Sequence, residues 1–107
     1  MSEVYITKSN KFLPNSPISN DEMENMLGLI NDETSKARRI VLRNNGIKNR
    51  FYAIDENGNP THSNADLTFL AIKGLFDDHF TSKNIELLSC GTSTPDLLLP
   101  SHAAMVH

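Results

Sequence analysis

The longest apolar segment of the chain, residues 65–79, constrains its fold more than any other feature. Its apolar residues recur at helical spacing but cover more than one stripe of a helix: Ala65, Leu67, Phe69, Leu70, Ala71, Ile72, Leu75 and Phe76. We therefore predict a long helix here, capped by Asn64 and buried on several sides.

This helix needs more cover than the rest of the chain offers. Leaving its far side in water would expose about four large apolar side chains, at ~1.5–3 kcal/mol each relative to burial. A small domain has only ~5–10 kcal/mol of net stability to set against that cost. We infer missing partners, either further sequence, a second subunit or both. The alternative is a complete small α/β domain whose last helix frays.

The segments around the helix predict an α/β fold. Strand patterns occur at residues 4–7, in an extended segment at 50–54, and at 85–90. The last of these is mostly apolar, which suits an inner strand of a sheet covered on both faces. Residues 55–60 have the composition of a turn, and a final helix is predicted to begin near Ser101.

Two shorter helices are predicted before residue 50. Ser19 and Glu22 have the spacing of a capping box, and Gly28 is a suitable stop for the helix that follows. A second helix is predicted over residues 32–44, with a left-handed stop at Gly46.

Composition excludes several classes of function. The formal net charge of −3 gives no overall attraction to nucleic acid or anionic lipid, and no apolar run is long enough to span a bilayer. The single cysteine, Cys90, excludes an internal disulfide and favours a reducing compartment. These features, and a start without a secretory signal, predict a cytoplasmic protein.

The usual chemistry-bearing residues do not form a recognisable site. Cys90 ends an apolar strand pattern, so we interpret it as a structural residue rather than a nucleophile. The histidines lack the spacing of metal ligands: His62, His79, His102 and His107. Neither a metal site nor a catalytic residue is predicted within residues 1–107.

The order of several short motifs is more specific than any one of them. Arg43-Asn44-Asn45-Gly46-Ile47 is followed by Arg50, then by the long helix, and then by Gly91-Thr92-Ser93-Thr94-Pro95-Asp96 and Leu99-Pro100-Ser101-His102-Ala103. Across nearly the whole chain this order resembles the N-terminal region of β-ketoacyl-acyl-carrier-protein synthase III. Within that family it looks closest to the branch that builds dialkylresorcinols and related aryl lipids.

The resemblance implies a fold and a reaction. Residues 1–107 would be the N-terminal portion of a thiolase-like condensing-enzyme domain, a layered α/β structure with a mixed sheet, in a homodimer. The enzyme would load an acyl group on a Cys and condense it with a second, carrier-bound thioester. That Cys would lie beyond His107, so this portion is expected to be inactive by itself. The substrate would be a thioester of acyl carrier protein phosphopantetheine or of coenzyme A, with no covalently bound cofactor.

Most of the basic residues lie in one stretch of the sequence: Lys36, Arg38, Arg39, Arg43, Lys48 and Arg50. One interpretation is a binding surface for an acidic carrier protein or for the phosphate of its pantetheine arm. The other is a solvated helix face with cations near the C-terminal end of the dipole. Arg43 is the best candidate for a binding residue.

The resemblance adds two further candidate residues and one departure. Many relatives hold coenzyme A with a Trp and an Arg at the positions of Ile40 and Asn44, so the implied substrate-binding position Asn44 has lost its charge. This favours an acyl donor on the carrier protein. Leu99 matches the apolar residue that reaches the partner subunit's acyl pocket, although a plain core contact also explains it. The alternative to a condensing acyltransferase is a complete, non-catalytic α/β interaction module.

Overall fold

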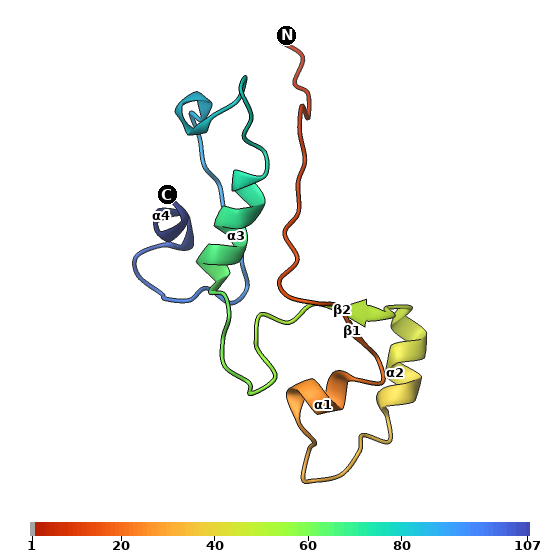
Figure 1. The fold of residues 1–107 in the computed structure, drawn as a ribbon. Coiled ribbons are helices and arrows are strands. Elements are labelled where there is room, and N and C mark those ends of the chain that lie inside the picture. Colours follow the sequence, from red (N-terminus) through yellow and green to blue (C-terminus); the bar gives the residue numbers. More distant parts are fainter. Residues whose placement is uncertain (1) are drawn as a thin grey trace. The chain divides into compact units, whose positions relative to one another are not determined.

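A computed structural model describes residues 2–107. The described elements are, in order, β1 (Ile18–Ser19), α1 (Met23–Leu27), α2 (Arg38–Asn45), β2 (Asn49–Arg50), α3 (Asn64–Lys73), a 3₁₀ turn (Ser82–Asn84) and α4 (His102–Val106) (Figure 1). They fall into two compact units. We call Pro14–Thr61 the α1–α2 unit, and His62–His107 with the described residues up to Leu13 the α3–α4 unit.

Two strands close the α1–α2 unit. β1 pairs antiparallel with β2, and Ile18 lies opposite Arg50. Between the strands, Glu24 of α1 joins the start of α2: its carboxylate accepts a hydrogen bond from the Ser35 amide at 2.9 Å and pairs with Arg38 at 3.1 Å. This two-stranded antiparallel sheet is the whole sheet structure of residues 2–107. The mixed, layered sheet implied by the family resemblance is therefore not present in this part of the chain.

The turn predicted at residues 55–60 is confirmed, and one carboxylate organises it. Asp55 accepts hydrogen bonds from the amides of Asn57 and Asn59 at 2.8 and 2.9 Å. Gly58 adopts a φ of 80°, which a residue without Cβ reaches at little cost. These hydrogen bonds, chiefly the one from the Asn59 amide, lower the pKa of Asp55.

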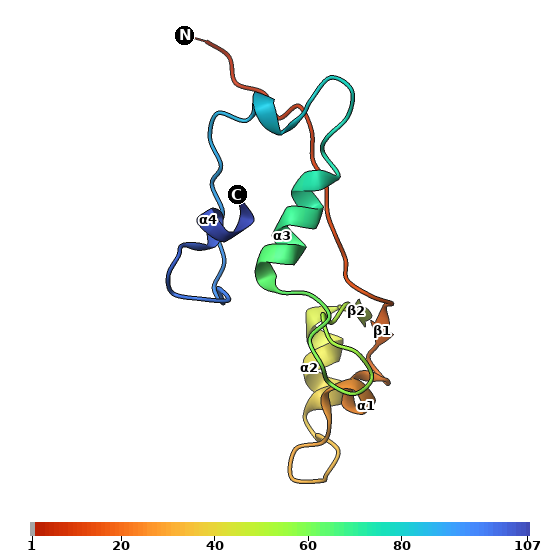
Figure 2. The ribbon, with the colours of Figure 1, turned by 60° about the vertical axis from the view of Figure 1, so that its left-hand side comes forward.

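The α3–α4 unit is built around α3. Ser63 is its N-cap, and Asp66 completes a capping box by accepting from the Ser63 amide at 2.9 Å. Both views show residues 2–13 running beside α3 and α4 lying against it (Figures 1 and 2). Two residues of the segment 2–13 attach it to α3 and the turn after it: the Asn10 side chain donates to the Ala71 carbonyl at 2.8 Å, and Lys8 pairs with Asp77.

The helix stops and starts predicted from small residues are largely confirmed. α1 ends at Gly28, with a φ of 83°, and α2 ends at Gly46 in the left-handed region, with a φ of 67°. Ser101 caps α4 by accepting from the Ala104 amide at 3.3 Å. The capping box predicted for Ser19 forms only in part: the Glu22 carboxylate accepts from the Ser19 amide at 3.0 Å, but the Ser19 hydroxyl donates to that carboxylate instead of accepting.

Two predicted helices are shorter than expected. The helix predicted over residues 32–44 begins only at Arg38, because Asn31 and Asp32 adopt positive φ angles of 53° and 58° and the chain turns there. The helix predicted over residues 65–79 ends at Lys73, and its N-cap is Ser63 rather than Asn64. Past its end, Asp77 accepts from the amides of His79 and Phe80, both at 2.8 Å, which favours a turn over further helix.

The strands predicted at residues 4–7 and 85–90 are wrong for this structure. A strand requires a neighbouring chain to pair its amides and carbonyls, and the described residues supply none to either segment. The segment predicted at 50–54 pairs only at Arg50, with an isolated bridge between Ile54 and Pro60.

The described chain lacks a sealed hydrophobic core. None of its large apolar side chains within residues 2–107 is fully buried, and on α3 the side chain of Phe69 is 44% exposed. The cover that the apolar sequence of α3 predicts is thus not supplied by the residues described. None of the helices in residues 2–107 has the length and apolar character needed to cross a bilayer.

Candidate functional site

A groove with a basic rim lies along α2 within the α1–α2 unit. Its lining comes from the turn before α1, from α2, and from the turn after it: Asn20, Asp21, Arg38, Arg39, Leu42, Arg43, Gly46, Ile47 and Lys48. Gly46 turns the chain back at the end of α2, and the Asn20 side chain then holds the Ile47 carbonyl at 2.9 Å. The volume of about 490 Å³ is in the range of small-molecule sites.

The structure separates the clustered cations into two groups. Arg38 is paired with Glu24, and Arg50 donates to the Asn20 side-chain oxygen at 2.5 Å and lies 3.2 Å from the Met23 sulfur. Both are half-buried, so they hold the unit together.

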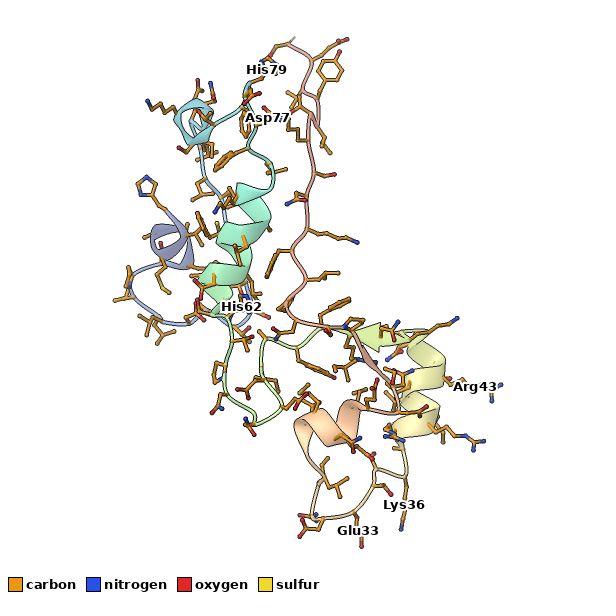
Figure 3. All side chains as sticks on the ribbon, viewed as in Figure 1. Glu33, Lys36, Arg43, His62, Asp77 and His79 are labelled. Atoms are coloured by element: carbon orange, nitrogen blue, oxygen red, sulfur yellow. The ribbon has the colours of Figure 1, made fainter. Side chains whose placement is uncertain are left out.

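The second group is free to bind. Arg39, Arg43 and Lys48 are exposed and line the groove, and their side chains make no hydrogen bond or ion pair with any residue of 2–107. Figure 3 shows Arg43 projecting away from α2 into solvent. Lys36 is also exposed but lies in the turn before α2, outside the lining of the groove.

The groove is therefore a local positive surface on a chain of net charge −3. Its acidic lining residue is Asp21, against the three free cations and the paired Arg38. Unpaired guanidinium and ammonium groups bind carboxylate and phosphate oxygens through charge-assisted hydrogen bonds. The arrangement favours an anionic ligand or an acidic protein surface.

The other two predicted binding residues do not line this groove. Asn44 follows Arg43 in α2 and is exposed, but it is not among the lining residues. Leu99 belongs to the α3–α4 unit, where it is exposed. Arg43 and Asn44 therefore lie together on α2, whereas Leu99 lies in the other unit.

Cys90 and the histidines show no arrangement typical of a catalytic or metal site. Cys90 is a free, half-buried thiol in an irregular segment, not in the inner strand that the sequence predicts. In the part of the chain that the structure describes, no three His, Cys, Asp or Glu residues lie close enough together to hold a metal ion.

Two contacts in the α3–α4 unit were missed by sequence reasoning. The Asp96 carboxylate accepts hydrogen bonds from the amides of Asn64 and Ala65, both at 2.8 Å, and these bonds lower its pKa. His102 is buried and lies 3.0 Å from the Thr68 hydroxyl. In each case the two partners are at least 31 residues apart, so no local pattern connects them.

Three curated relatives resemble this chain over most of its length. Proteins named β-ketoacyl-[acyl-carrier-protein] synthase III are 34% identical in Bordetella petrii, 28% in Xanthomonas oryzae pv. oryzae and 32% in Lactococcus lactis subsp. lactis. The matches cover 99%, 94% and 99% of this chain. The chain thus resembles proteins named β-ketoacyl-[acyl-carrier-protein] synthase III.

The family resemblance predicted from the motif order is thereby confirmed. The chain spans only about 30% of the length of these β-ketoacyl-[acyl-carrier-protein] synthase III relatives, with covered shares of 30%, 28% and 29%. No protein-family model matches the chain.

Proposed function

We propose that residues 1–107 are the N-terminal portion of a condensing acyltransferase that resembles β-ketoacyl-[acyl-carrier-protein] synthase III. The observation that carries this proposal is similarity over 99% of the chain to a relative of that name. The incomplete burial of the apolar side chains of α3 supports it: Phe69 is 44% exposed and the other large apolar side chains of the helix are only half-buried, so further protein would cover them. In this proposal the complete domain has the thiolase-like fold, forms a cytoplasmic homodimer and takes part in fatty acid or aryl-lipid biosynthesis.

The proposed reaction is acyl transfer followed by a Claisen condensation. A Cys thiolate outside residues 1–107 attacks an acyl thioester, takes the acyl group as an enzyme thioester and releases the thiol of the donor. The carbanion of a second thioester, formed by decarboxylation or by proton loss, then attacks the enzyme thioester and displaces the Cys. Residues 1–107 contribute substrate binding to this scheme and no reacting group.

The groove along α2 is proposed to bind acyl carrier protein. Arg39, Arg43 and Lys48 have no counter-charge of their own, so pairing with acidic side chains of a carrier, or with the phosphate of its pantetheine arm, forfeits no existing contact. Ile40, which is exposed, offers no ring on which an adenine could stack, and the adjacent Asn44 offers no charge for its phosphate. These features favour carrier protein over coenzyme A as the acyl donor.

The role of Arg43 can be tested in the protein encoded by the complete reading frame. Arg43→Glu should raise the KM for carrier-bound substrate about three- to tenfold, because one exposed charge pair is worth ~0.2–1 kcal/mol and the reversal adds repulsion. The kcat should change little, and the increase in KM should shrink in high salt. Steady-state kinetics at two salt concentrations measures both quantities.

Lys36→Glu is the matched control, since it makes the same charge change outside the groove. Equal effects of the two substitutions would indicate general electrostatics, and no effect of Arg43→Glu would refute binding at the groove.

An apolar groove between α1 and α2 favours the second candidate function, a non-catalytic interaction module. It is lined mainly by hydrophobic side chains, including Met23, Leu27, Leu29, Ile30, Val41 and Leu42. In the enzyme this groove is covered by further sequence, and in a module it binds a separate partner. A reading frame that continues into a Cys in a small-residue context supports the enzyme, and a stop codon after residue 107 supports the module.

A further inference from the structure

The segment before α4 is tied to the N-terminus of α3 by one carboxylate. The two oxygens of Asp96 accept from two successive amides, Oδ1 from Asn64 and Oδ2 from Ala65, both at 2.8 Å. In return, the Asn64 side-chain amide donates to the carbonyl of Thr94. These three hydrogen bonds fix residues 94–96 against the first turn of α3.

The segment after it is tied to the next turn of α3 by a buried histidine. His102 is only 8% exposed, and its Nε2 lies 3.0 Å from the Thr68 hydroxyl oxygen. That hydroxyl donates its proton to the Asn64 carbonyl at 3.0 Å, so it accepts from His102, and Nε2 carries the hydrogen. His102 thus binds α3 as a donor from the first residue of α4.

The leucines between these two attachments have no polar contact to hold them. Leu97, Leu98 and Leu99 are 54%, 91% and 84% exposed. Within residues 2–107, no hydrogen bond joins residues 97–100 to the rest of the chain. Their position follows from the attachments on either side, at Asp96 and at His102.

We infer that Asp96 and His102 are positioning residues that together hold the leucine segment 97–99 at a defined place on α3 and so set acyl-chain selectivity through Leu99. The last step rests on the proposed condensing-enzyme function and on the acyl-chain contact that the family resemblance implies for Leu99. The competing explanation is that Asp96 only caps α3, as a carboxylate at a helix N-terminus often does.

A second carboxylate on the same helix end separates these explanations. Asp66 also caps α3, through the Ser63 amide at 2.9 Å and the Ser63 hydroxyl at 2.8 Å, but it makes no hydrogen bond with residues 91–101. Asp66→Asn and Asp96→Asn therefore weaken the same helix terminus by the same chemical change. Only Asp96→Asn also loosens the leucine segment.

The first readout is acyl-chain preference in the protein from the complete reading frame. The ratio of kcat/KM for two acyl donors that differ by a few methylenes should change at least about threefold in Asp96→Asn, because each methylene contributes measurably to discrimination. Asp66→Asn should leave the ratio unchanged. His102→Leu should also change this ratio of kcat/KM values. His102→Gln should keep the ratio of the unsubstituted protein, because its side-chain amide keeps a donor near the position of Nε2.

The second readout does not depend on the enzyme activity. Limited proteolysis of the same proteins should cut within residues 91–101 several-fold faster in Asp96→Asn and His102→Leu than in Asp66→Asn, since cleavage follows local opening. Equal behaviour of Asp96→Asn and Asp66→Asn in both readouts would overturn the inference. If either variant is unstable, the His102→Gln and His102→Leu pair makes the same comparison.

Leu99→Ala distinguishes failure of the inference from failure of the proposed function. If Leu99→Ala shifts the chain preference and Asp96→Asn does not, the positioning role is wrong and the role of Leu99 stands. If Leu99→Ala leaves the preference unchanged, selectivity through Leu99 is wrong, and proteolysis still decides whether Asp96 and His102 hold the segment.

Discussion

Asn15 adopts a positive φ of 55°, and its side-chain amide donates to the carbonyl of Tyr52 at 2.7 Å and to the hydroxyl of Thr61 at 2.9 Å. Glu24 bridges two segments in a similar way, as does Asp96 in the other unit. Single polar side chains thus connect parts of the chain that lie far apart in the sequence. Asparagine tolerates the left-handed conformation better than most residues, so Asn15 suits its turn as well as its contacts.

At the residue scale, the arginines show what sequence position leaves open. Arg38 and Arg43 lie on the same short helix, yet one is paired with Glu24 and the other is free. The choice depends on where Glu24 lies in space, 14 residues earlier in the chain than Arg38. Clustering of charge therefore predicted a basic surface but not its members.

The first prediction at this scale concerns the single cysteine. Cys90→Ala in the protein from the complete reading frame should leave acyl loading within about twofold, because the half-buried thiol lies in an irregular segment and makes no hydrogen bond with any residue of 2–107 that would activate it. Mass spectrometry of the acyl-enzyme measures loading, and thermal unfolding serves as the control for folding. Loss of loading in a folded Cys90→Ala protein would show that the nucleophile had been misplaced.

At the scale of elements, the caps and stops formed by single residues were predicted better than the lengths of α2 and α3. Gly46 and Ser101 act within one helical turn, so their roles can be inferred from neighbouring residues. Ser63 and Asn64 are both good N-caps, and the choice falls on Ser63 because Asp66 stands three residues after it and completes the capping box.

The strands were predicted poorly for a physical reason. Residues 85–90 have a sequence suited to an inner strand, but pairing requires neighbours that the described residues do not provide. Ile18–Ser19 and Asn49–Arg50, by contrast, pair despite weak strand patterns, because α1 and α2 bring them together. Strand formation is decided by the partner as much as by the segment.

The second prediction belongs to α3 and its dependence on pH. Hydrogen bonds from Ser63 lower the pKa of Asp66, and hydrogen bonds from Asn64 and Ala65 lower that of Asp96. A carboxyl group with a lowered pKa in the folded state stabilises that state above its unfolded pKa of about 3.9. This contribution is lost as the pH falls through the lowered pKa, so α3 should weaken below about pH 4.

Denaturant unfolding at several pH values, followed by far-UV circular dichroism, measures this effect. Asp66→Asn should make the free energy of unfolding depend less steeply on pH, but not remove the dependence, since Asp96 still titrates. Asp78→Asn is the control, because Asp78 is exposed and makes no hydrogen bond with any residue of 2–107. If Asp66→Asn leaves the slope of unfolding free energy against pH unchanged, ionisation of Asp66 does not stabilise α3.

At the scale of the whole molecule, exposed apolar surface dominates. Exposed large side chains occur in both units, among them Ile30 and Val41 in the α1–α2 unit and Phe69 and Leu98 in the α3–α4 unit. Soluble monomers rarely expose apolar surface on this scale, so further protein is expected to cover it.

The third prediction follows from that exposure. Residues 1–107 expressed alone should increase the fluorescence of a hydrophobic dye several-fold more than the protein from the complete reading frame at equal molarity. Alternatively, residues 1–107 should self-associate, because association buries the same apolar surface. Size-exclusion chromatography would detect this association. A monomer of residues 1–107 that binds no dye would contradict the proposal that this is part of a larger fold.

The amino-acid sequence by itself determined the resemblance to β-ketoacyl-[acyl-carrier-protein] synthase III, the stops at Gly28 and Gly46, the turn around Asp55 and the presence of a basic surface. These depend on motif order or on interactions between residues within a turn of one another. The tertiary structure decided which strands pair, which arginines are free, and that Asp96 and His102 contact α3. Each of these depends on segments far apart in the chain meeting in space, and a contact of that kind leaves no pattern among neighbouring residues.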